Sequence, residues 1–318
     1  MRKAKVYLYD KNWIIAFSQE SELIKGIFGG ELLNIYHIGS TSIPGMAAKP
    51  IIDILIEVQE INTVDSFNRE MKKLGYIPRG ENGIKNRRYF VKEKDDKRTH
   101  HIHIYQTGAK EIIKHLAFRD YLIENQTEAE QYKVIKQEIS QIYPHNVKLY
   151  QEQKSLVVNN LTEKALLWAG RNKKTSVTGF ILREKETNNF ELLSLSFQSI
   201  PNASWRVPGG GVEKNENLVD ALYREIKEET GLIDLTLIRE MGVLHYYKPY
   251  IKRIVERHDF LLLAPPNTAD SWNHIVTGKD KDQGMVFEYK WLRENDFLNI
   301  DGELRSFLIP KYIPELFD

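Results

Sequence analysis

The chain has 318 residues, which is long enough for two domains with separate cores. Its 45 lysines and arginines nearly balance its 44 aspartates and glutamates, which argues against nucleic acid or an anionic membrane as a partner. Cysteine is absent, which excludes disulfides and thiolate metal sites, and the longest apolar runs are too short to span a bilayer. We therefore expect a soluble cytoplasmic protein that does not bind membranes.

The first segments of the chain alternate between extended and helical patterns. Residues 6–9 are strand-like, and apolar residues then recur at roughly helical spacing over residues 13–27. The segment IYHIGSTSIPG follows and predicts a regular element that ends in a turn of small residues, where Gly39 permits close backbone approach and Ser40 offers a hydroxyl. The next segment, IIDILIEV, predicts a buried strand interrupted by one acid, Asp53.

Two stretches of this half carry a family resemblance. The segment HIGSTSIPGMAAKPIIDI looks like the hallmark of the GrpB-like (UPF0157) family, and HIHIYQTGAKEIIKHLAFRDYL is similar to a later part of it. The resemblance runs from about residue 6 to residue 168. It implies a nucleotidyltransferase-type fold for residues 1–169.

The resemblance also implies a nucleotide site. In that superfamily a Gly-Ser turn holds a triphosphate, and the following strand presents two acids two residues apart. Gly39 and Ser40 match the turn and Asp53 matches the first acid, whereas Leu55 stands where the second acid is expected. We therefore expect Gly39, Ser40 and Asp53 to bind the nucleotide.

Two histidines extend this candidate site. His101 and His103 share one face of a predicted strand, because side chains alternate along a strand, and the superfamily places its third carboxylate there. Histidines can replace a carboxylate as ligands of metal or phosphate. Two interpretations stay open, transferase chemistry and a degenerate nucleotide-binding or structural domain.

A polar connector separates the two halves. A helix predicted over residues 156–168 is broken by the segment GRNKK, residues 170–174, which we take as the linker before a second domain, residues 175–318. In this domain β-rich segments precede and follow one helical segment, and a helix is expected near the end of the chain. The predicted strands cover residues 175–182, 190–197, 235–245, 257–263 and 285–291.

The helical segment of the second half has an unusual density of fixed residues. The stretch GGVEKNENLVDALYREIKEETGL fits the pattern G-x5-E-x7-R-E-U-x-E-E-x-G-U, where U is a bulky aliphatic residue. The fixed positions are Gly210, Glu216, Arg224, Glu225, Ile226, Glu228, Glu229, Gly231 and Leu232.

The residue types in this stretch predict a capped amphipathic helix with an acidic face. Asn217 is a suitable N-cap, Asp220 follows three residues later as in a capping box, and Gly231 ends the helix. An apolar stripe would pack on a sheet. The second face carries three carboxylates at i, i+3 and i+4, with Ala221 one turn earlier to leave room beside them, and clustered oxygen ligands suit Mg²⁺ or Mn²⁺. The stripe comprises Val219, Leu222, Tyr223 and Ile226, and the carboxylates are Glu225, Glu228 and Glu229.

The stretch resembles the signature of the Nudix hydrolases. That resemblance implies an α/β/α sandwich in which Glu228 and Glu229 bind the metal and Glu225 is a third ligand or the general base. It further implies that Arg224 orients a glutamate and that the Gly210 region supplies backbone ligands. Such domains often add one more acid or histidine, and the sequence does not rank the candidates Glu288, Asp280, Asp282 and His274.

The sequence thus predicts a Mg²⁺-dependent Nudix hydrolase that cleaves a pyrophosphate bond in a nucleoside diphosphate linked to a group X. Its first domain is expected to bind a nucleotide. Two alternatives are a nucleotidyltransferase acting on a small molecule or protein, with an editing Nudix half, and a sensor that binds a nucleotide metabolite without turnover. The expected partner is a small nucleotide, and the oligomeric state is open, a homodimer included.

Overall fold

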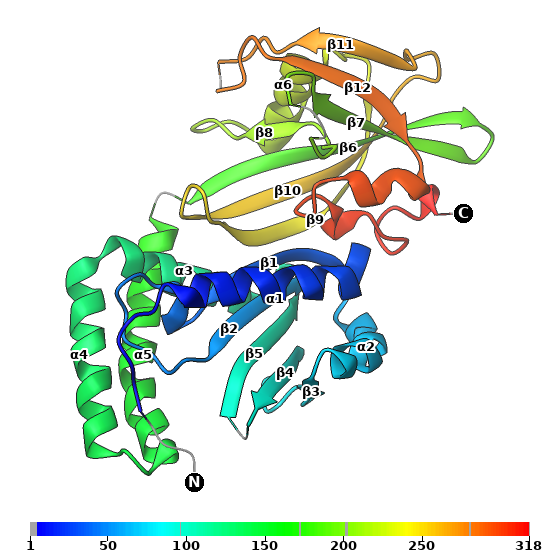
Figure 1. Cartoon of the computed structure of the whole chain (residues 1–318). Helices are drawn as coiled ribbons and strands as arrows, with labels where there is room; N and C mark the ends of the chain where they lie inside the picture. The colour runs from blue at the N-terminus through cyan, green and yellow to red at the C-terminus, as the bar shows by residue number, and fades with distance from the viewer. Residues whose placement is uncertain (1–4, 96, 172, 201–202, 280, 318) are drawn as a thin grey trace. The chain divides into compact units, whose positions relative to one another are not determined.

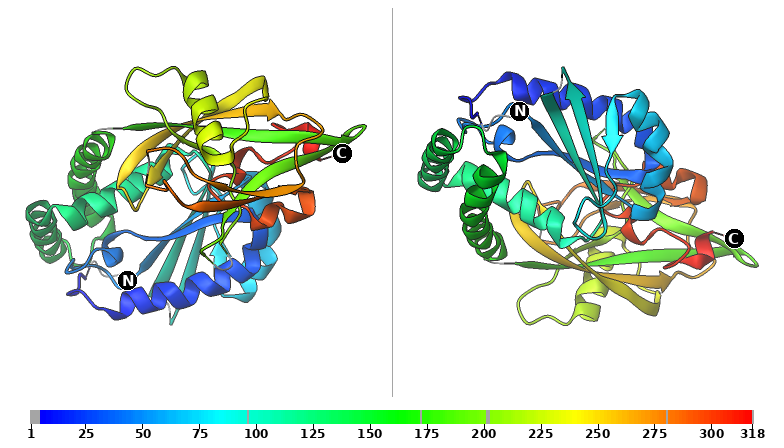
Figure 2. Two further views of the ribbon diagram at one scale, coloured as in Figure 1. Left: turned by 90° about the horizontal axis from the view of Figure 1, so that it is seen from above. Right: turned by 90° about the horizontal axis from the view of Figure 1, so that it is seen from below.

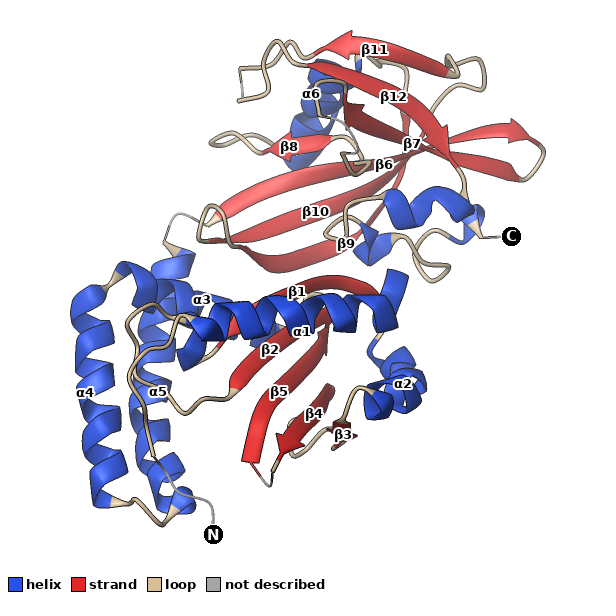
Figure 3. Ribbon diagram, viewed as in Figure 1, coloured by secondary structure: helices blue, strands red, loops and turns tan. Residues whose placement is uncertain are grey.

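The chain forms two compact units, each of which contains helices and strands (Figure 3). The first unit comprises Met1–Lys173 with Tyr246–Ile254, and the second comprises Lys174–His245 with Val255–Asp318. The predicted α/β (α+β) class is confirmed. This computed structural model describes residues 5–95, 97–171, 173–200, 203–279 and 281–317.

The first unit is built on a five-stranded sheet with the strand order β1-β2-β5-β4-β3. The central strands β2 and β5 are parallel, and the other neighbours are antiparallel. The parallel register places Asp53 beside His101 and Leu55 beside His103. The strands are β1 Leu32–Ile38, β2 Ile52–Val58, β3 Tyr76–Pro78, β4 Arg87–Lys94 and β5 Lys97–Gln106.

Helices cover both faces of this sheet (Figures 1 and 2). Because side chains alternate along β2, Ile52, Ile54 and Ile56 enter one core, to which Ile24 of α1 and Met71 of α2 belong. The opposite face of β2 meets α3 and α5 in a second core. The helices are α1 Asn12–Phe28, α2 Asn68–Lys73, α3 Lys110–Glu124, α4 Gln126–Ile142 and α5 Val147–Gly170.

The first predicted elements are confirmed in part. The helix expected over residues 13–27 is α1, Asn12–Phe28. The strand expected over residues 6–9 is reduced to one bridge between Tyr7 and Ala48. Tyr7 and Leu8 are exposed and bury little apolar surface, so packing gives little support to a longer pairing of this segment.

The second unit is built on a seven-stranded sheet with the order β11-β12-β7-β6-β10-β9, and β8 pairs with β6. Strands β6 and β10 are parallel, whereas β6 with β7, β7 with β12 and β11 with β12 are antiparallel. The short strands β8 and β11 lie outside the predicted segments. The strands are β6 Lys174–Glu186, β7 Asn189–Phe197, β8 Gly209–Gly211, β9 Thr236–Lys248, β10 Arg253–Leu263, β11 Ser271–Ile275 and β12 Val286–Leu292.

One α-helix, α6 Leu218–Thr230, packs on this sheet through Leu222 and Ile226. The α-helix expected near the end of the chain is wrong, because the described residues there form the 3₁₀ turns η4 Glu294–Asn299, η5 Arg305–Phe307 and η6 Pro314–Leu316. Pro310 and Pro314 lack an amide N–H and interrupt any longer helix. None of the helices that the structure describes has the length and apolarity needed to cross a bilayer.

Candidate functional site

The first candidate site lies along α6, whose ends are set by local chemistry. The side chain of Asn217 accepts a hydrogen bond from the Val219 amide at 2.8 Å, which confirms the predicted N-cap. Gly231 adopts a left-handed conformation with φ of 77°, as a helix-ending glycine does. The reciprocal bond expected from Asp220 is not among the hydrogen bonds of the described residues. The cap nevertheless fixes where the acidic face begins.

The acidic face is more buried than a solvated helix surface. Glu225 is 4% exposed and Glu229 is 9% exposed, whereas the Glu228 side chain keeps 29% of its surface. Ala221, expected beside the acids, belongs to the apolar core with Ile226. Two carboxylates buried this deeply need partners, since burying an unpaired charge is costly.

Arg224 supplies much of that pairing. Its Nε donates to Glu216 Oε1 at 2.7 Å and its Nη2 donates to Glu216 Oε2 at 2.8 Å, a bidentate geometry. Its Nη1 donates to Glu225 Oε1 at 2.9 Å and to Glu228 Oε2 at 3.3 Å. A further bond from Nη2 reaches the Gly211 carbonyl at 2.8 Å. One guanidinium therefore joins the loop before the helix to two of the three carboxylates.

The glycines of the loop lie against the other side of the acids. The Gly209 amide donates to Glu229 Oε2 at 2.9 Å. A Cβ atom on Gly210 would lie 2.2 Å from Glu225 Oε2, a distance that real Cβ atoms do not reach. Only glycine therefore lets the loop backbone come this close to the acidic face.

The electrostatics of the site reflect burial and crowding. Burial raises the pKa of Glu229 to about 8; the Gly209 hydrogen bond opposes this shift, and the charges of Glu225 and Asp282 add to it. The Arg206 guanidinium acts in the opposite direction. Burial and the neighbouring acids thus make the Glu229 carboxylate costly to ionise on its own, and a cation bound beside it would favour the ionised form.

The structure separates the four downstream candidates. Asp282 acts on Glu229 electrostatically, and His274 Nε2 lies 3.1 Å from the Glu228 carbonyl oxygen. Glu288 is exposed on β12, and Asp280 lies outside the described residues. Arg206 was not singled out from the sequence, although its place directly before the VPGGG segment was a usable signal.

The donor set of this site suits a divalent cation. Three carboxylates and a loop carbonyl are hard oxygen donors of the kind that Mg²⁺ prefers. Among the described residues no three acidic or histidine side chains surround one point at binding distance, and two of the acids are bound to Arg224 instead. The chemistry of the residues fits, and the tight approach of Gly210 to Glu225 provides the cradle.

The second candidate site is centred on Asp53 in the first unit. Asp53 Oδ1 lies 3.1 Å from His101 Nδ1 and 3.9 Å from His103 Nε2. Burial opposes ionisation of Asp53, but the two histidines outweigh it and hold the pKa of this carboxyl well below its usual range. Gly39, with φ of 71°, is so close that a Cβ atom would lie 2.5 Å from Asp53 Oδ2. The structure thus brings Gly39, Asp53 and both histidines together.

Ser40 begins the 3₁₀ turn η2, Ser40–Ser42, and has a partner that sequence reasoning missed. Lys136 of α4 donates to Ser40 Oγ at 2.9 Å and to the Ala47 carbonyl at 2.6 Å. Burial lowers the pKa of Lys136 to about 6, and Lys154 adds to the shift. The available signal was a lysine on the apolar stripe of α4, between the buried Tyr132 and Ile139.

Leu55 occupies the position on β2 where the family resemblance places a second acid. It is fully buried in the core beneath α3, on the face of the strand that also carries Asp53. The position predicted for a second carboxylate is therefore occupied by core packing.

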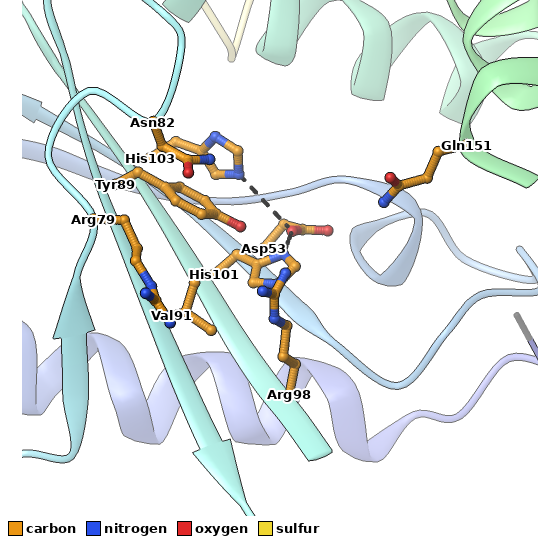
Figure 4. A pocket seen from close by; sticks show the side chains of 9 residues that line it. All are labelled: Asp53, Arg79, Asn82, Tyr89, Val91, Arg98, His101, His103 and Gln151. Carbon is orange, nitrogen blue, oxygen red and sulfur yellow. Dashed lines mark hydrogen bonds and ion pairs between the residues drawn. The ribbon is translucent and has the colours of Figure 1, made fainter. Parts of the chain in front are cut away.

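A pocket of about 560 Å³ opens beside Asp53 (Figure 4). Its polar lining combines side chains of β2, the β3–β4 connection, β4, β5 and α5. The lining residues are Asp53, Arg79, Asn82, Tyr89, Val91, Arg98, His101, His103 and Gln151.

Comparison with known proteins assigns both units. The family described as "GrpB protein" matches residues 3–164, half of the chain. The chain belongs to the GrpB family. A second match, described as "NUDIX domain", covers residues 172–309. The predicted fusion of a GrpB-like part with a Nudix part is therefore confirmed, and the units are called the GrpB unit and the NUDIX unit below.

Individual relatives agree with this assignment. The chain is 44% identical over 193 residues to UPF0157 protein YqkA of Bacillus subtilis (strain 168), covering 60% of this chain and 56% of that relative. The chain thus spans little more than half the length of that protein. The crystal structure of conserved protein GrpB from Enterococcus faecalis is 40% identical, covers 52% of this chain and 98% of its own, and has a TM-score of 0.50. A 57-residue stretch is 39% identical to an RNA pyrophosphohydrolase of Bartonella tribocorum (strain CIP 105476 / IBS 506), covering 18% of this chain and 33% of that enzyme.

Proposed function

We propose that the NUDIX unit is a pyrophosphohydrolase that depends on Mg²⁺ or Mn²⁺ and cleaves a nucleoside diphosphate linked to a group X. The observation that carries this proposal is the arrangement around Arg224, which binds Glu216, Glu225 and Glu228 at once. A helix surface that served only solubility has no need of buried acids, a shared guanidinium and a glycine loop at contact distance.

The residues divide into ligands and positioning groups. Glu228 and Glu229 are the proposed metal ligands, Gly210 lends a backbone oxygen, and Glu225 is either the third ligand or the base. Arg224 orients Glu225 and Glu228. A bound divalent cation supplies charge neutralisation at the phosphates and lowers the pKa of a bound water.

Two groups at the edge of the acidic face complete the proposed site. Asp282 is proposed as the additional downstream acid, because its charge already acts on Glu229. Arg206 is proposed as a contact for substrate phosphate, since its Nε has no hydrogen-bond partner among the described residues and guanidinium groups match phosphate geometry.

A substrate screen tests the proposal. The full chain is incubated with ADP-ribose, UDP-glucose and other nucleoside diphosphates linked to X, with and without Mg²⁺, and released nucleotide and phosphate are measured. An arm with RNA bearing a 5′-triphosphate is included because of the similarity to an RNA pyrophosphohydrolase. Hydrolysis of a small nucleotide supports the proposal. Hydrolysis of the RNA 5′-triphosphate alone would contradict the proposed small-nucleotide substrate and assign RNA as the substrate instead.

We further propose that the GrpB unit binds a nucleotide at Gly39, Ser40 and Asp53. The close approach of Gly39 to Asp53 supports it. The buried Leu55 weighs against metal-dependent transfer, so binding is favoured over the nucleotidyltransferase alternative. Titration of the full chain with ATP, beside Ser40→Ala and Asp53→Asn variants, tests the site, and binding that neither substitution weakens would contradict it.

The sensor alternative is separated from the hydrolase by turnover. A protein that only binds a nucleotide metabolite has no need for an Arg224 fork that aligns carboxylates. Tight binding in the presence of Mg²⁺ without any product would favour the sensor.

A further inference from the structure

The pocket beside Asp53 carries more positive than negative charge. Arg79 and Arg98 line it, and Asp53 is the one carboxylate among the nine described lining residues. The imidazole of His101 lies between the Arg98 side chain and Asp53, whereas His103 approaches Asp53 from the side away from Arg98 (Figure 4). A pocket with this balance favours an anion over a cation.

The two arginines are available to a ligand to different degrees. Arg79 is exposed, and no side-chain hydrogen bond or ion pair joins it to another residue within the described ranges. Arg98 uses its Nε for one 3.3 Å contact with Glu93 Oε1 and extends toward His101 and Asp53 (Figure 4). A guanidinium has five N–H donors, so one contact leaves Arg98 with donors to spare.

The state of His101 follows from its partner. Asp53 is ionised, and a carboxylate can only accept hydrogen bonds, so His101 Nδ1 carries the proton of the 3.1 Å contact. Its Nε2 then has a free lone pair in the neutral ring, and this buried atom has no partner among the described residues. A protonated ligand oxygen would satisfy it.

We propose that this pocket binds the phosphate group of a phosphate ester directly, without a divalent cation: Arg79 and Arg98 donate to its oxygens, and a P–OH of the singly protonated group donates to His101 Nε2. Arginine forks bind phosphate oxygens in pairs, and the two arginines supply the positive charge that a metal would otherwise bring. Asp53 acts as a positioning residue by fixing the tautomer of His101. The inference deepens the nucleotide binding proposed for the GrpB unit, on which it rests, and places the phosphate on the arginine side of Asp53.

Calorimetric titration with inorganic pyrophosphate tests the inference. The full chain carries Glu229→Gln and the buffer contains EDTA, so that the NUDIX unit does not bind the probe through a metal. We expect binding in EDTA, and about 10-fold weaker binding for Arg79→Gln and for Arg98→Gln, because each loses a charge-assisted contact. His101→Gln weakens binding as well, and circular dichroism shows whether each variant is folded.

The matched control is Lys85→Gln, which removes one positive charge from an exposed residue outside the pocket lining and leaves the affinity unchanged. Binding that requires Mg²⁺ overturns the inference. A loss of pyrophosphate affinity in Lys85→Gln equal to that in Arg79→Gln also overturns it. Citrate that binds as tightly as pyrophosphate overturns the assignment to phosphate.

The two proposals for the GrpB unit fail in different ways. ATP binding that depends on Ser40 and Asp53 but not on either arginine leaves the nucleotide site standing and removes this inference. Pyrophosphate binding that depends on the arginines, without ATP binding, leaves the phosphate pocket standing and removes the nucleotide site.

Discussion

Arg224 shows how one side chain can organise a site at the scale of single residues. Its contacts to Glu216, Glu225 and Glu228 are 3.3 Å or shorter and come from one planar group. A lysine would keep the charge, but a single ammonium cannot present the same fork. The planar geometry of the guanidinium therefore holds the acids in place, and its charge contributes only part of the effect.

Replacement of Arg224 by lysine tests this role. We expect turnover of the screened substrate to fall by about 10-fold or more, since misplaced catalytic groups lose rate steeply. The matched control is Arg239→Lys, because Arg239 makes a similar fork to Glu315 away from the acidic face. A rate loss in Arg239→Lys equal to that in Arg224→Lys would refute the assigned role.

Two half-buried histidines of the GrpB unit predict acid sensitivity. Burial lowers the pKa of His37 to about 4 and that of His115 to about 3. In the unfolded chain both histidines have the ordinary pKa near 6.5. Between pH 6.5 and the lower pKa values of the folded state, the unfolded chain therefore binds more protons than the folded chain. The free energy of unfolding is unaffected by them above pH ~6.5 and falls as the pH drops toward 4, by at most about 1.4 kcal/mol per pH unit for each histidine.

Urea unfolding between pH 7 and pH 5, followed by circular dichroism, measures this slope. His115→Phe should reduce it, because the substitution removes one titrating group and keeps a ring beside His103. The control is His145→Phe at an exposed position, which should leave the slope unchanged. Equal slopes in all three proteins would contradict the prediction.

At the level of elements, a single residue, Gly39, likewise constrains the turn between β1 and β2. Gly39 has a positive φ and no room for a Cβ beside Asp53, so the turn, the acid and the strand register depend on one another. Gly39→Ala should destabilise the GrpB unit by about 1–2 kcal/mol from the backbone alone, and by more from the contact with Asp53.

Gly26→Ala is the matched control for this substitution. Gly26 lies exposed within α1 with nothing within 4 Å of the added Cβ, so alanine should stabilise the protein by about 0.5–1 kcal/mol. Urea unfolding measures both variants. Opposite signs are expected, and a Gly39→Ala protein as stable as the parent would contradict the account of the turn.

The elements differ in how far the sequence could predict them. Strands such as β2 and helix α6 carry long, regular apolar patterns, and the pattern of fixed residues led directly to the acidic face. The three-residue β8 pairs through glycines and has no side-chain pattern to read. The α-helix expected near the end of the chain does not form among the described residues, because Pro310 and Pro314 lack the amide N–H that a longer helix needs.

The contacts of charged residues were harder to foresee. Lys136 reaches Ser40 across 96 positions of sequence, and the two arginines of the pocket come from separate places, Arg79 directly after β3 and Arg98 on β5. Only the folded sheet brings them to one place.

At the scale of the whole molecule, we propose that residues 1–169 and 175–318 are domains joined by residues 170–174. The two domains are not fully independent along the sequence, because Tyr246–Ile254 lie within residues 175–318 but belong to the first compact unit. Within that unit Tyr247 is buried in the core, and its hydroxyl donates to Asp120 Oδ2 at 3.0 Å. A fragment that ends at Trp168 lacks this side chain.

We therefore expect fragments 1–168 and 172–318 both to fold, the first with reduced stability. Tyr247→Ala in the full chain should destabilise the GrpB unit by about 3–5 kcal/mol through the cavity left behind, and Tyr247→Phe by about 1–3 kcal/mol. Urea unfolding gives these values. A 1–168 fragment as stable as the intact unit, or unfolding of both fragments, would contradict this description.

The central claim is that the acids of α6 perform hydrolysis of a pyrophosphate bond, and one measurement tests it most directly. The rate of Mg²⁺-dependent hydrolysis of the best substrate from the screen is compared among the parent, Glu228→Gln, Glu229→Gln and the exposed control Glu240→Gln. We expect the first two variants to stay folded and to lose about 100-fold or more in turnover, because each loses a ligand charge with little change in volume. Glu240→Gln should keep the parent rate, and hydrolysis at the parent rate by both Glu228→Gln and Glu229→Gln would contradict the claim.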